Sequence, residues 1–84
     1  MIDFSLSSLD LAPAKHPLRV SAVRAPGAAP EWARWLEEVG FIAGEHVMIL
    51  TRHAFGGDPM VVRIGSSTFA LRRAEAACID VVAI

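Results

Sequence analysis

The sequence predicts a mainly β protein, a small antiparallel barrel of about five strands with one short amphipathic α-helix. Apolar residues follow a helical period only over about residues 30–39, whereas elsewhere they form short runs bounded by glycine, proline and serine. The chain has only 84 residues. A sheet that closes on itself hides strand edges that so small a domain could not otherwise cover.

The helix over about residues 30–39 carries apolar side chains at i, i+3, i+4 and i+7. They are Trp32, Trp35, Leu36 and Val39. Pro30 suits the first turn, and Gly40 suits the left-handed conformation that ends a helix, with Phe41 folding back onto the last turn. We expect both tryptophans to pack in the core. The alternative is a partly exposed Trp32 that anchors a partner.

Strands are expected over five stretches, 18–24, 45–53, 60–64, 68–71 and 79–84. Gly44 allows a tight turn before the second strand, and a single helical turn over 73–76 precedes the last. Residues 1–17 contain leucines but also Pro13 and Pro17, which exclude a long helix. We expect one domain over residues 1–84, with residues 1–17 as an N-terminal extension or a lid over one end of the core.

Composition and charge exclude several classes of function. The net charge is −1 and the only arginine doublet is Arg72-Arg73, whereas a nucleic-acid binder usually presents a basic face. No apolar run approaches the roughly 18 residues that span a bilayer, so we expect no membrane insertion. The N-terminus lacks the features of a secretory signal. With a single cysteine, the chain fits a reducing, cytoplasmic environment.

The sequence offers no recognisable active site. Cys78 lies among apolar residues, which raises a thiol's pKa and leaves it inert. The histidines do not have the spacing of a metal motif. His53 and Asp58 bracket a loop and are either solvated residues or a weak surface site for a divalent ion. The same two interpretations apply separately to His46 with Glu45, because His46 and His53 point to opposite sides of the second expected strand. We expect a binding protein rather than an enzyme, with no required cofactor.

The loop before the third strand and the arginine doublet are the candidate partner-binding residues. Phe55 is an apolar side chain beside Gly56 and Gly57 at a loop tip, where it has little to pack against. Asp58 ends this loop. Arg72 and Arg73 are either a solvated pair or a charged docking patch.

Three spaced blocks of the sequence resemble the FeoA family, small SH3-like proteins of bacterial ferrous iron transport. The blocks are Leu36-x-x-Val39-Gly40-Phe41-x-x-Gly44-x-x-Val47-x-Ile49, Gly57-Asp58-Pro59-Met60-x-Val62-x-Ile64 and Ala70-Leu71-Arg72-Arg73-x-Glu75-Ala76-x-x-Ile79-x-Val81. Phe55 and Gly56 depart from the family, which often has a proline and then a bulky residue there.

The resemblance implies a non-enzymatic accessory protein that binds the cytoplasmic GTP-binding region of the FeoB permease. A related domain occurs in iron-dependent repressors, so a free-standing metal-responsive regulatory or scaffold domain is the alternative. A weak homo-oligomer also remains open.

Overall fold

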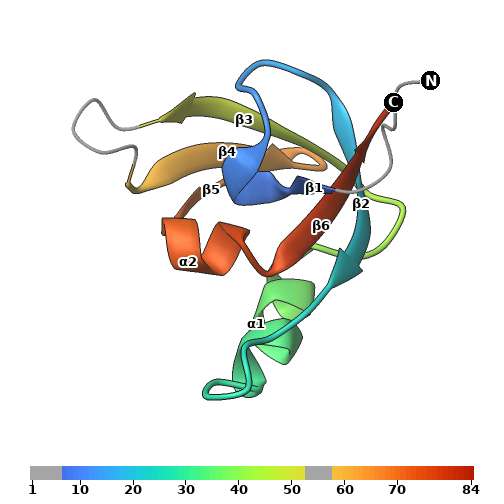
Figure 1. Ribbon diagram of the computed structural model, residues 1–84. Coiled ribbons are helices and arrows are strands. Elements are labelled where there is room, and N and C mark those ends of the chain that lie inside the picture. The colour runs from blue at the N-terminus through green and yellow to red at the C-terminus, as the bar shows by residue number, and fades with distance from the viewer. Residues whose placement is uncertain (1–6, 53–57) are drawn as a thin grey trace.

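The computed structural model describes residues 7–52 and 58–84, and the described chain is mainly β (Figure 1). Its strands are β1 (Ser7–Ser8), β2 (Leu18–Val23), β3 (His46–Arg52), β4 (Met60–Ile64), β5 (Ser67–Leu71) and β6 (Ile79–Ala83). Its helices are the 3-10 helix η1 (Leu9–Leu11) and the α-helices α1 (Glu31–Val39) and α2 (Arg73–Ala76). The predicted fold class is confirmed, but the sequence analysis missed β1. None of the helices in the described ranges has the length and apolarity needed to cross a bilayer.

The strands form one antiparallel sheet in the order β1-β6-β2-β3-β4-β5. Within the described chain no ladder joins β1 to β5, the two ends of this order. Instead α2, which follows β5, contacts η1, which follows β1. Leu9 of η1 and Ala76 of α2 are both buried in the core. The ends of the sheet are therefore bridged by short helices rather than by strand pairing.

Helix α1 ends as its sequence predicts. Gly40 has a φ of 124°, a conformation that side chains with a Cβ rarely adopt. The Gly40 N–H donates to the Glu37 carbonyl at 3.1 Å, and the Phe41 N–H donates to the Leu36 carbonyl at 3.0 Å. Phe41 is fully buried, so the chain folds back under the last turn before it enters β3.

The apolar stripe of α1 is only partly covered by the sheet. Leu36 is fully buried, whereas Trp32 and Val39 pack against the core while partly exposed. Trp35 is 44% exposed. The expectation that both tryptophans are core residues is therefore wrong for Trp35. Trp35 and Leu36 form the two opposite edges of the stripe at 100° per residue. The core covers the edge that carries Leu36 and leaves the edge that carries Trp35 in solvent.

The segment before β2 is held to β3 by one backbone hydrogen bond and one from a side chain. The Lys15 N–H donates to the Ile49 carbonyl at 2.7 Å, and the Arg52 guanidinium donates to the Ala12 carbonyl. Leu9 is fully buried, but Leu11 is 76% exposed. Of the leucines assigned to a lid, Leu9 thus belongs to the core and Leu11 faces solvent, and Leu6 lies outside the described residues.

Candidate functional site

The β4–β5 hairpin brings two of the predicted partner-binding segments together. Its register places Met60 opposite Leu71. Residues just before β4 must therefore meet residues just after β5. Asp58 and the start of α2 consequently lie side by side, although they are far apart in the sequence.

Carboxylates satisfy the first backbone donors of α2. Asp58 Oδ1 accepts a hydrogen bond from the Arg73 N–H at 2.9 Å. Glu75 Oε1 accepts one from the Arg72 N–H at 2.8 Å. The first N–H groups of a helix have no partner within the helix, so such acceptors stabilise its first turn. The contacts fix α2 against the residue that precedes β4.

Asp58, Arg72 and Arg73 are all exposed. Together they form a mixed-charge surface, the α2 surface, made of these three residues and Glu75. Its described members place carboxylates and guanidinium groups side by side, a charge pattern that can complement a protein surface. Phe55 and Gly57, the other predicted members, lie outside the described residues.

The candidate metal ligands are not gathered in one place. His46 begins β3 beside Gly65, whose N–H donates to the His46 carbonyl at 3.0 Å. Asp58 lies at the other end of the β3–β4 pair, near the Arg52–Met60 partners. At the usual strand rise these ends are about 20 Å apart. His53 lies outside the described residues, and within the described ranges no group of three or more His, Cys, Asp or Glu residues could hold a metal ion.

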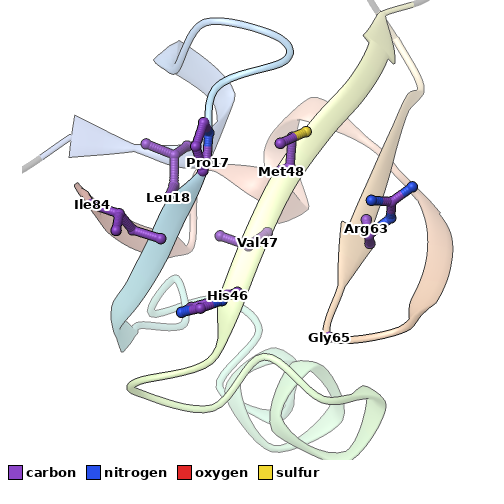
Figure 2. Close-up of a pocket in the computed structure, with 8 residues that line it drawn as sticks. All are labelled: Pro17, Leu18, His46, Val47, Met48, Arg63, Gly65 and Ile84. Atoms are coloured by element: carbon purple, nitrogen blue, oxygen red, sulfur yellow. The ribbon is translucent and has the colours of Figure 1, made fainter.

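His46 instead lines a surface hollow of about 240 Å³ between β2, β3 and β4 (Figure 2). The other lining residues are Pro17, Leu18, Val47, Met48, Arg63, Gly65 and Ile84. Ile84 is 62% exposed, so the hollow has an apolar rim. Among its described lining residues there is no carboxylate or thiol to act with His46. His46 therefore has no acid–base or nucleophilic partner among the described residues of this lining.

A second hollow, of about 580 Å³, lies between the start of α1 and α2 and was missed by the sequence analysis. It is lined by Arg24, Ala25, Pro26, Trp32, Ala74, Ala77 and Cys78. Two features of the sequence could have indicated this hollow: Trp32, a large aromatic residue, and the alanine-rich stretch 74–77. Trp32 is half-buried in the structure. At its edge the exposed Arg24 guanidinium forms an ion pair of 2.7 Å with the largely buried carboxylate of Asp80.

Cys78 in this hollow has the inert character that its sequence setting predicts. Its Sγ lies 3.5 Å from the Ala74 carbonyl oxygen, within hydrogen-bond distance for sulfur. Burial raises the pKa of the thiol, and the nearby carboxylates of Glu75 and Asp10 raise this pKa further. The thiolate is the reactive form of cysteine, and a raised pKa reduces the fraction of Cys78 present as thiolate. Cys78 therefore has the character of a structural cysteine.

Comparisons with known proteins agree with this fold. The FeoA domain model matches residues 7–83. The FeoA of Stenotrophomonas maltophilia, solved in complex with zinc and described as an SH3 domain protein, is 36% identical over 89% of this chain and 88% of its own, with a TM-score of 0.77. The iron(II) transport protein A of Clostridium thermocellum is 29% identical over 93% of this chain and 46% of its own, with a TM-score of 0.78.

A manganese-dependent transcriptional repressor shares the fold over 94% of this chain and 42% of its own, at 23% identity and a TM-score of 0.79. No curated protein matches the sequence. The family model covers nearly the whole chain, and the FeoA of Stenotrophomonas maltophilia covers most of it at more than 30% identity. The chain therefore belongs to the FeoA family, small SH3-like proteins associated with ferrous iron transport.

Proposed function

We propose that this protein is a cytoplasmic, non-enzymatic accessory of ferrous iron uptake that binds the cytoplasmic GTP-binding region of a FeoB permease. The α2 surface is the proposed contact. The observation that carries the proposal is the hydrogen bond from the Arg73 N–H to Asp58. It joins the two sequence segments singled out as partner-binding into one surface.

The chemistry of the α2 surface supports protein recognition. Exposed arginines are enriched in protein interfaces, because the guanidinium group makes several directed hydrogen bonds and stacks on flat groups. Helix α2 is short but anchored, since Ala76 is fully buried and Glu75 closes its first turn. Arg72 and Arg73 therefore project from a backbone that loses little freedom on binding.

Titration of the purified cytoplasmic domain of the cognate permease tests the proposal. The double variant Arg72→Ala/Arg73→Ala is expected to weaken binding at least about tenfold, because truncation of a central interface arginine commonly costs more than 1 kcal/mol. Arg63→Ala is the matched control, since Arg63 is an exposed arginine on β4 away from Asp58. No binding by the wild type at high micromolar concentration, or equal loss in the control, would contradict the proposal.

A metal-responsive regulatory or scaffold domain is the second candidate function. It is supported by the zinc held by the FeoA of Stenotrophomonas maltophilia. Calorimetry with Fe²⁺ and with Zn²⁺ tests it on the wild type, on His46→Ala and on His53→Ala, with His16→Ala as the control. A tight site that either of the first two variants removes would favour this candidate. Heats no larger than those of buffer would exclude it.

A further inference from the structure

Within residues 7–52 and 58–84 the outer edge of β5 has no strand partner. β5 ends the strand order and, among these residues, pairs only with β4. Natural edge strands are usually shielded by charged residues, proline, a bulge or very short length. β5 has the sequence Ser-Thr-Phe-Ala-Leu, and its register with β4 runs without a bulge. The other end of the sheet differs, since β1 has only two residues.

The hairpin register shows which backbone groups face outward. Gly65 and Ser66 form a two-residue loop, so the flanking pair Ile64 and Ser67 exchanges hydrogen bonds. Groups alternate along an antiparallel strand, and Phe69 therefore bonds to β4 like Ser67. Thr68 and Ala70 direct their N–H and C=O groups away from β4. Both residues are exposed, and by this register their outward backbone groups face no other strand of the described chain.

We propose that two copies of this chain associate through β5, whose free edges pair antiparallel about a two-fold axis at Phe69. In this register Thr68 of each copy lies opposite Ala70 of the other, and each of these pairs can exchange both of its N–H···O=C bonds. The outward N–H groups of each copy thus face the outward C=O groups of the other, as a two-fold symmetric interface requires. The sheet then continues from one copy into the next.

Charge favours a second copy as the occupant of this edge. The five residues of β5 are uncharged, so identical strands meet without repulsion between like charges. Beyond the strand, the same register places Arg72 opposite Ser66 of the second copy. In that second copy Ser66 follows Gly65. The Glu45 carboxylate of the same copy lies beside Gly65, since its Oε1 is 3.6 Å from the position that a Cβ on Gly65 would occupy. The long arginine side chain is then near an exposed carboxylate of the other copy.

The association is expected to be weak. A five-residue edge buries far less surface than a stable protein–protein interface, so we expect a Kd on the order of 0.1–1 mM for the isolated protein.

NMR and sedimentation equilibrium over protein concentrations from about 20 µM to about 1 mM test the proposal. The amides of Thr68 and Ala70 are expected to shift with concentration and to exchange more slowly with solvent, while the average mass rises toward a dimer. A concentration-independent monomer overturns the proposal. A dimer whose concentration-dependent amide shifts map to residues outside β5 also overturns it. The same holds if the β5 edge pairs with the permease domain but not with a second copy.

Variants at Ala70 test the edge directly. Ala70→Pro removes an outward N–H without removing a β4–β5 hydrogen bond, and proline is tolerated on edge strands in this orientation. It is expected to abolish the association, whereas the matched control Ala70→Thr keeps the N–H and should retain it. If circular dichroism shows that the proline variant is unfolded, Ala70→Lys serves instead, because it places like charges near the axis. A dimer that persists in both Ala70→Pro and Ala70→Lys overturns the proposal.

A charge exchange tests the register. Glu45→Arg and Arg72→Glu are each expected to weaken association several-fold, and the double variant is expected to restore it. Because Arg72 also belongs to the α2 surface, Glu45→Arg separates the two proposals: it should weaken self-association but leave permease binding unchanged. Failure of the double variant to recover overturns the proposed register.

Discussion

Replacement of Gly40 by alanine is expected to destabilise the protein through its backbone rather than through a clash. Gly40 has a φ of 124° and a ψ of 0°. A Cβ at this position would lie 3.7 Å from Ile64 Cγ1, which is an ordinary van der Waals contact. The cost therefore comes from holding an alanine in a conformation that L residues rarely adopt.

The size of this cost follows from the strain of such conformations, about 1–3 kcal/mol. A domain of this length has a free energy of unfolding of roughly 4–13 kcal/mol, so a sizeable share of it would be lost. The midpoint of thermal unfolding is expected to fall by roughly 5–20 °C. Gly27→Ala is the control, because Gly27 has no positive φ and nothing lies within 4 Å of its added Cβ. It is expected to be neutral or to stabilise by about 0.4–1 kcal/mol.

Urea unfolding followed by tryptophan fluorescence measures both variants, since Trp32 and Trp35 lie on the helix that Gly40 ends. The midpoint of Gly40→Ala should fall at an unchanged m value. Gly44→Ala, at a φ of 95° in open space, should also be destabilised. If Gly40→Ala were as stable as Gly27→Ala, the argument from backbone strain would be refuted.

Three further predictions concern the core, the thiol and the start of α2. Leu36→Ala should lower the free energy of unfolding by about 2–5 kcal/mol in urea titrations, whereas Leu11→Ala, at a side chain 76% exposed, should change it by less than about 0.5 kcal/mol. The pKa of the Cys78 thiol is raised in the folded state. The thiol therefore contributes stability below the unfolded thiol's pKa of about 8.5, and this contribution is lost as pH rises through the folded pKa. Between pH 8 and 10 the free energy of unfolding should fall more for the wild type than for Cys78→Ala, and equal slopes of this free energy against pH would refute the prediction. Asp58→Ala removes the acceptor of the Arg73 N–H and should cost about 1 kcal/mol in thermal unfolding, with Asp58→Asn closer to the wild type.

Local sequence signals were sufficient for most of the fold. The period of α1, the stop at Gly40 and the strand over 60–64 each depend on residues near one another in the sequence, and the structure confirms all three. Helix α2 was also predicted over the residues that the structure gives, 73–76. Such signals are strong because backbone conformation and side-chain period are local properties.

Features that depend on distant parts of the chain could not be predicted in this way. A strand of two residues such as β1 has no measurable period, and it exists because β6 offers it an edge. The exposure of Trp35 depends on which edge of the α1 stripe the core covers, and the helical period alone does not decide this. The contact between Asp58 and Arg73 follows from the register of the β4–β5 hairpin, which the two-residue loop sets but which the sequence analysis did not work out.

The pairing of β6 with both β1 and β2 constrains how the protein folds during synthesis. Ser7 pairs with Val81, so β1 waits for nearly the whole described chain to be translated. Strand β2 can pair early with β3 through Leu18 and Val47, but its other edge waits for β6, which is made seconds later at roughly 5–20 residues per second. The strands β3, β4 and β5 are neighbours in both sequence and sheet, so this meander can assemble first. The last strand to emerge then completes the sheet.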